Sequence, residues 1–278
     1  MTAPLPPTAP VLVTGCSSGI GRATVQHLLR GPRPVYATAR DTSSLDDLKV
    51  AGARVLALDV TDDEARRAAV RAVEDEHGAV GALVNNAGYG EYGPVEEIPL
   101  DAVRRQFETN VFGLLGLTQL VLPAMRAAGR GRIVNISSMG GRMTLPGGGA
   151  YHASKHALEA LSDALRFETR GFGLGVSVVS PGPVRTDFVD EATAPGEGEG
   201  PYADFMRGVA ARNATAYSSG PGVLSADDVA AVVVRAVEDA RPKPRYTVGF
   251  VARQLAGARR VLPTRVWDAA LRQQYPTP

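Results

Sequence analysis

Tyr151 and Lys155 are the two residues whose types and spacing most directly suggest chemistry. Residues four positions apart on a helix project from the same face. An ammonium group close to a phenol stabilises the phenolate and lowers the phenol pKa from about 10 toward the working range. The pair therefore predicts a general acid and base at Tyr151, while Lys155 can also hold ribose hydroxyls. Because a Tyr-x-x-x-Lys pair also occurs by chance, its interpretation depends on the rest of the chain.

A serine hydroxyl ahead of that pair is a candidate for binding a substrate oxygen. Ser138 follows residues 133–137, which are typical of a buried strand, and lies thirteen positions before Tyr151. Ligands of a parallel sheet bind beyond the carboxyl ends of its strands, so we expect Ser138 beside the substrate. The neighbouring Ser137 is the alternative, and it could equally be a structural hydroxyl.

A glycine-rich loop lies between the first predicted strand and the first predicted helix. Its glycines would let the backbone turn tightly and approach a pyrophosphate, whose charge is met by free N–H groups at the helix N-terminus. The spacing G-x-x-x-G-x-G differs from the commoner G-x-G-x-x-G, and an ordinary turn is the alternative. The predicted cofactor-binding residues of this loop are Gly15, Ser17, Ser18, Gly19, Ile20 and Gly21. Cys16 is interpreted as a small loop residue, because no histidine is close to it in sequence.

The choice of nucleotide should be visible at the end of the second predicted strand. An acidic residue there binds the ribose 2′-hydroxyl of NAD, whereas a basic residue binds the 2′-phosphate of NADP. Arg40 directly follows the strand and Asp41 comes next. We therefore predict a preference for NADP(H), with Arg40 against the phosphate and Ser18 or Thr38 assisting. Asp41 keeps NAD(H) as the alternative.

The elements that must position these residues alternate between short β-branched runs and longer segments of helical period, which favours βαβ units. The predicted strands are Val11–Thr14, Pro34–Ala39, Arg54–Leu58, Ala82–Asn85, Arg132–Ile136, Val176–Ser180 and Arg245–Val248. The predicted helices are Gly19–Arg30, Asp62–His77, Asp101–Met125, Ala150–Gly171 and Ala226–Asp239. Right-handed crossovers between such units give a Rossmann-like, doubly wound α/β fold, with one parallel sheet of about seven strands and helices on both faces.

Two regions depart from this alternation. Residues 188–222 are rich in Gly, Pro, Glu and Ala, carry a helical patch around Tyr202–Ala211, and are predicted to form a substrate lid. Residues 250–278 predict one or two amphipathic helices broken at Pro263. We expect this extension to pack on the protein's own surface or on a neighbouring subunit, and contact with a membrane surface is a weaker alternative.

Length and composition exclude several classes of protein. The 278 residues, 44% of them hydrophobic, suffice for a core, and α/β domains of roughly 250 residues occur as one unit, so we expect one domain over residues 1–278. The net charge of +1 gives no reason to expect a nucleic-acid partner, and the single cysteine excludes a disulfide framework. The scattered histidines predict no metal site, and His152 and His156 are assigned packing or surface roles. Residues 1–10 lack signal-peptide features and no apolar run is long enough for a membrane span, so we expect a cytoplasmic protein.

Taken jointly, these motifs resemble those of the short-chain dehydrogenase/reductase family over nearly the whole chain, from the glycine loop to at least Tyr246. The matching landmarks occur in the family's order and spacing: residues 14–21, Asp59 with Val60, residues 85–88, Asn110, Ser138, Tyr151 with Lys155, and residues 181–186. The resemblance implies an NAD(P)-dependent oxidoreductase that transfers a hydride between the cofactor and a carbonyl or alcohol carbon.

The same resemblance implies a catalytic group of Asn110, Ser138, Tyr151 and Lys155. Tyr151 would exchange a proton with the substrate oxygen, Ser138 would hydrogen-bond that oxygen, and Asn110 would hold a water connected to Lys155. Further cofactor contacts are implied for Asp59 and Val60 at the adenine, Asn86, Ala87 and Gly88 along the cofactor, and Val184 and Thr186 at the nicotinamide carboxamide, on the loop that begins with Pro181 and Gly182.

Within the family, the chain resembles the type-1 17β-hydroxysteroid dehydrogenase and retinol dehydrogenase-like branch. The matching stretches are residues 14–21, Val35–Thr38, Leu145-Pro146 and Lys155–Glu159. They imply an apolar ketone, aldehyde or alcohol as substrate, and the family implies a homodimer or homotetramer. Two other functions stay open, namely an NADP-binding regulator without turnover and an isomerase or dehydratase that keeps its cofactor bound.

Overall fold

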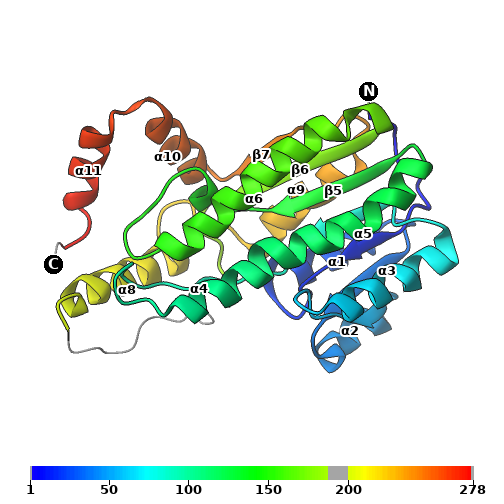
Figure 1. Ribbon diagram of the computed structural model, residues 1–278, viewed down its shortest axis with the longest axis horizontal. Coiled ribbons are helices and arrows are strands. Elements are labelled where there is room, and N and C mark those ends of the chain that lie inside the picture. Colours follow the sequence, from blue (N-terminus) through cyan, green and yellow to red (C-terminus); the bar gives the residue numbers. More distant parts are fainter. Residues whose placement is uncertain (1, 187–199, 277–278) are drawn as a thin grey trace.

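The structure is a computed structural model that describes residues 2–186 and 200–276. Its centre is one parallel sheet of seven strands in the order β3-β2-β1-β4-β5-β6-β7 (Figure 1). The strands are β1 Val11–Val13, β2 Val35–Ala39, β3 Arg54–Ala57, β4 Ala82–Asn85, β5 Gly131–Ile136, β6 Leu174–Pro181 and β7 Arg245–Val248. The chain order reverses between β1 and β4, which confirms the predicted doubly wound fold and places a crevice at the carboxyl ends of these strands.

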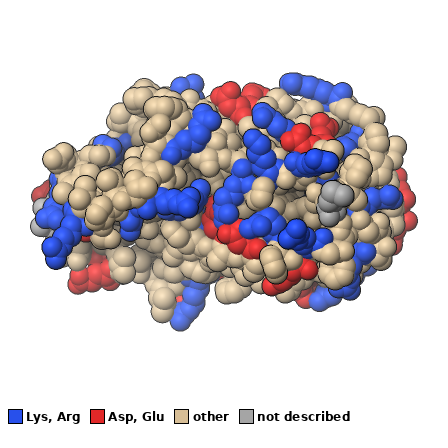
Figure 2. Space-filling model, turned by 90° about the horizontal axis from the view of Figure 1, so that it is seen from above, with Lys and Arg blue, Asp and Glu red and all other residues tan. Residues whose placement is uncertain are grey.

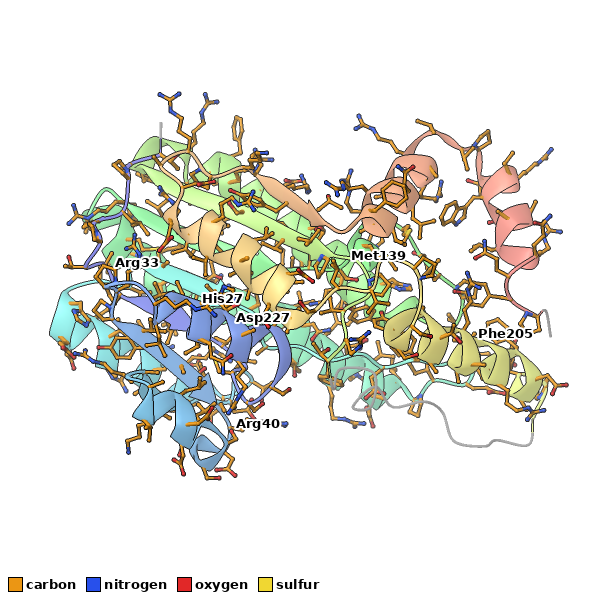
Figure 3. All side chains as sticks on the ribbon, turned by 180° about the vertical axis from the view of Figure 1, so that it is seen from behind. His27, Arg33, Arg40, Met139, Phe205 and Asp227 are labelled. Atoms are coloured by element: carbon orange, nitrogen blue, oxygen red, sulfur yellow. The ribbon has the colours of Figure 1, made fainter. Side chains whose placement is uncertain are left out.

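Helices cover both faces of the sheet, because strands buried on both sides need an apolar layer above and below. Helices α1 (Gly19–Leu28) and α9 (Ala226–Glu238) pack together on one face. His27 of α1 and Asp227 of α9 lie 2.8 Å apart at this contact (Figure 3). The helices of the other face are α3 (Asp63–His77), α4 (Leu100–Phe107), α5 (Leu114–Ala127) and α6 (Gly149–Glu168) (Figure 1). Each face has its own apolar core of buried strand and helix residues.

The predicted helix Asp101–Met125 is interrupted in the structure. A π-helical turn, Glu108–Gly113, separates α4 from α5 and carries the predicted site residue Asn110. A π turn inserts a residue into the helix and rotates the side chains that follow, and such turns are frequent at functional sites. Gly113 packs the turn closely against the loop between β3 and α3, because a Cβ atom on Gly113 would lie 2.6 Å from the Val60 carbonyl oxygen. The apolar period of the sequence does not reveal this extra residue.

Short helices complete the connections between the main elements. The 3-10 helix η1 (Thr42–Leu45) and α2 (Asp46–Val50) join β2 to β3 and were not predicted, because they are too short to show a helical period. The 3-10 helix η3 (Met139–Gly141) follows β5, and η4 (Arg170–Phe172) precedes β6.

The lid and the C-terminal extension are helical where they are described. Helix α8 (Ala203–Ser218) is longer than the patch expected there, while residues 188–199 of the predicted lid lie outside the described residues. Helices α10 (Phe250–Val261) and α11 (Thr264–Arg272) confirm the predicted break at Pro263. The chain then returns to α8, where the Arg212 guanidinium lies 5.1 Å from the centre of the Tyr275 ring. Within the described ranges, every helix is too short or too polar to cross a bilayer.

Candidate active site

A cavity of about 820 Å³ opens at the carboxyl ends of the central strands. We call it the cofactor cleft. Most of the predicted site residues line it: Gly15, Ser17, Ser18, Gly19, Ile20, Arg40, Asp59, Val60, Asn86, Ala87, Gly88, Ser138, Tyr151, Lys155, Pro181, Gly182, Val184 and Thr186. Gly21 and Asn110 are not part of this lining, but each of them contacts residues that are.

The glycine loop forms a cradle at the start of α1. A Cβ atom on Gly21 would lie 2.2 Å from the Gly15 carbonyl oxygen, so the loop can close only over a glycine. The Asn86 side-chain amide donates to the Thr14 and Gly15 carbonyl oxygens, both at 2.9 Å, and thereby fastens the loop to the end of β4. Ser18, at the N-cap of α1, makes no side-chain capping bond. The first N–H groups of α1 are thus available to a phosphate, which fits a dinucleotide.

The residues predicted to select the nucleotide, at the end of β2, have different surroundings in the structure. Arg40 is exposed and lines the cleft. The Asp41 carboxylate instead accepts a 2.9 Å hydrogen bond from the Ser43 N–H and caps η1. Thr38 does not assist Arg40 as predicted, because it is buried and donates its hydroxyl to the Val13 carbonyl oxygen at 3.1 Å. Arg40 is therefore the charged member of the predicted group that faces the cleft.

Asp59 lies on the other wall of this nucleotide end. Its carboxylate accepts hydrogen bonds from the N–H and hydroxyl of Thr61, at 2.8 and 2.7 Å. Partial burial acts to raise the pKa of Asp59, but these bonds and the nearby Arg40 and Arg66 charges hold it below its usual value. A fixed carboxylate acceptor is suited to an adenine amino group.

Tyr151 and Ser138 meet at the other end of the cleft. Tyr151 is 5% exposed, and its hydroxyl is hydrogen-bonded to the Ser138 side chain. Ser138 also accepts from the Gly140 N–H at 3.1 Å, which fixes its rotamer at the start of η3. The neighbouring Ser137 directs its hydroxyl to the Ser138 carbonyl oxygen at 3.5 Å, a weak structural contact. The contact with Tyr151 therefore favours Ser138 over Ser137 as the substrate-binding hydroxyl.

The expected lowering of the Tyr151 pKa by Lys155 is wrong for this structure. Burial raises the pKa of Tyr151 well above its usual value, the Tyr217 phenol adds to the rise, and the hydrogen bond to Ser138 offsets only part of it. The Lys155 ammonium lies 5.9 Å from the centre of the Tyr151 ring and donates to the Ile136 carbonyl oxygen at 3.0 Å. In this arrangement desolvation outweighs the ammonium charge, so Tyr151 is a neutral phenol that can donate a proton.

Burial lowers the pKa of Lys155 to about 8, although Glu159 acts to raise it. Because the unfolded chain keeps this proton until about pH 10.5, the folded state binds fewer protons above pH 8, and stability must rise with pH there. We expect the wild type to gain about 1.5 kcal/mol over Lys155→Met between pH 8 and pH 9.5. Urea unfolding of both proteins at the two pH values measures this gain. The control is Lys49→Met, which removes an exposed lysine, and the wild type should show no such gain over it. If the stability of Lys155→Met changed with pH in parallel with that of the wild type, the lowered pKa of Lys155 would be contradicted.

Asn110 is fully buried and braces the cleft from behind. Its amide donates to the Tyr89 carbonyl oxygen at 2.9 Å and to the Ser154 hydroxyl at 3.0 Å, and its oxygen accepts from the Tyr89 N–H at 3.1 Å. These bonds tie the π-helical turn to α6 and to the segment after β4. The role of holding a water beside Lys155 stays a prediction.

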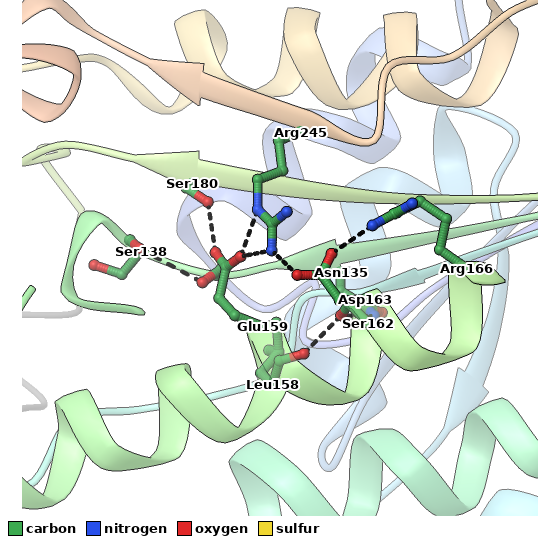
Figure 4. A network of polar contacts seen from close by, with 10 residues as sticks. Asn135, Ser138, Leu158, Glu159, Ser162, Asp163, Arg166, Ser180 and Arg245 are labelled. Carbon is green, nitrogen blue, oxygen red and sulfur yellow. Dashed lines mark hydrogen bonds and ion pairs between the residues drawn. The ribbon is translucent and has the colours of Figure 1, made fainter. Parts of the chain in front are cut away.

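A buried polar network sets the position of α6, the helix that carries Tyr151 and Lys155 (Figure 4). Glu159 accepts from the Ser180 hydroxyl of β6 and from Arg245 Nε of β7, both at 2.9 Å. Arg245 also pairs with Asp163 one turn further along, at 2.6 Å. Because these bonds join α6 to two strands, they fix the helix against sliding along the sheet.

His152 has the packing role that was predicted. Its Nδ1 atom accepts from the Leu145 N–H at 3.2 Å, and its ring fills the space beside Gly140 and Gly148. Burial lowers the pKa of His152 to about 4, so the ring is neutral at physiological pH. Cys16 is also inert as predicted, since burial raises the pKa of its thiol to about 12.

Two tyrosines complete the site and were not found from the sequence. The Tyr92 ring lies 5.9 Å from the Tyr151 ring, and the Tyr92 hydroxyl is hydrogen-bonded to Tyr217 of α8. Tyr217 also lines the cofactor cleft. No motif marks either residue, and their positions after β4 and in the lid were the only available signal.

The motif set and this geometry agree with the match to known families. The sequence pattern described as short chain dehydrogenase matches residues 9–196. The chain belongs to the short-chain dehydrogenase/reductase family. It is therefore an oxidoreductase of that family, and its fold is one that binds a nicotinamide cofactor.

Three curated family members illustrate the similarity. A 3-ketodihydrosphingosine reductase of Bacteroides thetaiotaomicron is 41% identical over 201 residues, covering 71% of this chain and 73% of the relative. An NADPH-dependent 3-dehydrocapnine reductase of Ornithobacterium rhinotracheale is 34% identical over 271 residues, covering 92% and 94%. Retinol dehydrogenase 8 of Bos taurus is 35% identical over 253 residues, covering 84% and 80%.

Solved structures of family members share the fold. A short-chain dehydrogenase from Streptomyces avermitilis superposes with a TM-score of 0.81 at 33% identity, over 96% of this chain and 95% of that one. A short-chain dehydrogenase/reductase from Burkholderia phymatum, in complex with NAD, has a TM-score of 0.80 at 26% identity, over 98% and 97%.

Proposed function

We propose that the protein is an NADP(H)-dependent enzyme that interconverts a carbonyl and an alcohol on an apolar small molecule. The observation that carries the proposal is the neutral Tyr151 phenol, hydrogen-bonded to Ser138 and placed beside Lys155 at one end of the cofactor cleft. A phenol held neutral is ready to donate a proton to a ketone oxygen, which supports the reductive direction. The 3-keto and retinol compounds in the relatives' names support an apolar ketone or alcohol as substrate.

Each catalytic residue has one task in this reaction. A nicotinamide cofactor held in the cleft would supply or accept the hydride. The hydroxyl groups of Ser138 and Tyr151 orient the substrate oxygen, and Tyr151 donates its proton as negative charge develops there. Lys155, with a pKa of about 8, is mostly charged at neutral pH and stabilises the phenolate that results. Asn110 holds the Tyr89 segment and α6 in place and acts through them.

The cofactor cleft also fits the residues assigned to the nucleotide. The uncapped start of α1 would hold the pyrophosphate, and the 181–186 loop lies beside it, because a Cβ atom on Gly19 would be 3.2 Å from the Thr186 side chain. Arg40 is assigned to the 2′-phosphate, and the engagement of Asp41 in capping η1 supports NADP over NAD.

The experiment that tests the proposed activity is oxidation of NADPH and of NADH, followed by the absorbance of the reduced nicotinamide, over a panel of apolar ketones and aldehydes. We expect turnover with several members of the panel and a higher kcat/KM with NADPH. Stoichiometric binding of the nucleotide without turnover on any member would contradict the proposal and favour the NADP-binding regulator. Bound nucleotide that copurifies, with substrate conversion but no net redox change, would favour the isomerase or dehydratase.

Arg40→Ala is expected to reduce the preference for NADPH over NADH by about tenfold, because a charge-assisted contact with the 2′-phosphate is lost. The ratio of the two kcat/KM values measures the change. Arg30→Ala, which removes another exposed arginine at the end of α1, is the matched control and should leave the ratio unchanged. An unchanged ratio in Arg40→Ala would remove the phosphate contact from the proposal.

A further inference from the structure

A second cavity, of about 1270 Å³, lies beneath the C-terminal helices. We call it the C-terminal cavity. Residues of α10 and α11, the two C-terminal helices labelled in Figure 1, line its outer wall, and residues 141–147, the segment between Ser138 and Tyr151, line part of its inner wall. Among the described residues, the linings of the C-terminal cavity and the cofactor cleft have no member in common. The C-terminal cavity is therefore a separate candidate site, and its size exceeds that of typical small-molecule pockets, roughly 300–1,000 Å³.

Apolar side chains from four segments of the chain face into the C-terminal cavity. They are Val95 after β4, Leu145 and Pro146 before α6, Phe205 of α8 (Figure 3), and Trp267 and Leu271 of α11. Val95 is 83% exposed although it sits on this wall. Covering apolar surface of this kind with an alkyl chain is favourable, by about 0.8 kcal/mol for each CH₂ group that is buried.

The charged groups of the same wall are unevenly paired. Two of its four carboxylates, Glu159 and Asp163, are paired with Arg245. Glu96 accepts from the Tyr202 hydroxyl at 2.6 Å and keeps its charge, and Asp268 is the fourth acid.

Against these two acids without a cationic partner among the described residues, Glu96 and Asp268, stand three arginines of the wall, namely Arg142, Arg259 and Arg260. In the described part of the chain they have no hydrogen-bond or ion-pair partner. The helices of the outer wall add to the positive charge, because residues 250–276 contain five arginines and one aspartate. Figure 2, which views this side of the molecule, shows Lys and Arg spread over the surface.

From the apolar walls and the unpaired guanidinium groups, we propose that the C-terminal cavity binds one molecule of an anionic amphiphile. Its alkyl chain would lie against Leu145, Phe205 and Trp267, and its carboxylate or phosphate group would contact Arg259 and Arg260. This site does not depend on the proposed reductase activity, because it uses neither Tyr151 nor the nucleotide end of the cofactor cleft. A bound chain would also cover the Arg142–Gly147 segment.

The test uses Trp267, the single tryptophan of the chain, as its reporter. Trp267 is 7% exposed and lines the C-terminal cavity, so a bound chain should change its emission. We expect dodecyl phosphate, kept monomeric, to give a saturable fluorescence change with one molecule bound per chain. Octyl phosphate should bind more weakly, by about three- to fourfold for each buried CH₂ group removed. Dodecyltrimethylammonium, with the same chain and the opposite charge, should bind at least about tenfold more weakly.

The double variant Arg259→Ala/Arg260→Ala should weaken the binding of dodecyl phosphate by about tenfold or more. Its matched control is Arg253→Ala/Arg265→Ala, which removes two exposed arginines of the same helices that do not line the cavity and should leave the affinity unchanged. Equal weakening in both variants would mean that only the overall charge of the helices matters, and would overturn the site. Circular dichroism confirms that both variants remain folded.

Three results would overturn the proposal. One is the lack of a saturable Trp267 response to monomeric dodecyl phosphate. Another is cosedimentation with vesicles of phosphatidylcholine and phosphatidylglycerol without a response to the monomer, which would assign the basic helices to a membrane surface. The last is a Trp267 emission that shifts with protein concentration alone, which would assign the cavity to a second copy of the chain.

Discussion

Tyr151→Phe is expected to lower kcat by about 10²–10⁴-fold while leaving the Kd for NADPH close to the wild-type value. The substitution removes the hydroxyl that is proposed to donate the proton and keeps the ring that packs beside Tyr92. Because the phenol of Tyr151 is buried and neutral, no solvent proton can readily replace it. Steady-state oxidation of NADPH with a ketone substrate measures kcat, and nucleotide fluorescence measures the Kd.

The matched control for this variant is Tyr246→Phe. The Tyr246 hydroxyl accepts from the Lys243 N–H at 2.9 Å, away from the cofactor cleft, so its loss affects stability and not kcat. A Tyr151→Phe enzyme with normal kcat would contradict the proton-transfer role. A variant that loses the affinity for NADPH together with kcat would instead mean that Tyr151 acts mainly in binding.

Gly21→Ala is expected to weaken NADPH binding by up to about 100-fold, because overpacking at a rigid contact costs about 1–3 kcal/mol. The added methyl group would lie 2.2 Å from the Gly15 carbonyl oxygen and 2.5 Å from the Asn86 amide nitrogen. Both contacts belong to the cradle that holds the loop, so the backbone of the loop must move. Titration of the nucleotide measures the change in Kd.

Gly31→Ala is the control for this second substitution. A Cβ atom on Gly31 has the Leu28 carbonyl oxygen as its nearest neighbour, at the ordinary contact distance of 3.5 Å. We expect its Kd for NADPH to be unchanged. A Gly21→Ala protein with wild-type affinity would contradict the close approach of the loop to the cofactor.

Motifs carried by one continuous segment could be predicted well from the sequence. The glycine loop from Gly15 to Gly21 has its place fixed by a strand before it and a helix after it, and the seven strands follow from runs of β-branched residues. The helical period was enough to place Tyr151 and Lys155 on one face of α6, while their interpretation as a catalytic pair rested on the other motifs. In each of these cases the local chain geometry determines the result.

Features set by contacts between distant segments could not be predicted. The hydroxyl of Thr38 points to the Val13 carbonyl oxygen of β1, a choice that depends on the neighbouring strand. The raised pKa of Tyr151 depends on its burial and on the nearby Tyr217 phenol, which lies in α8. The π-helical turn at Asn110 depends on the close contact of Gly113 with Val60. Sequence patterns describe a residue's own element and do not describe the solvent exclusion produced by others.

The most direct test of the hydride-transfer mechanism is the fate of the C4 hydrogen of NADPH. The wild-type enzyme would be mixed with an apolar ketone and NADPH that carries deuterium on the C4 face that is transferred, with the opposite face labelled in a parallel reaction. We predict that the alcohol from one of the two reactions carries one deuterium, on the carbon that was the carbonyl carbon. An alcohol without deuterium in both reactions, at full consumption of the ketone, would contradict direct transfer of hydride to that carbon.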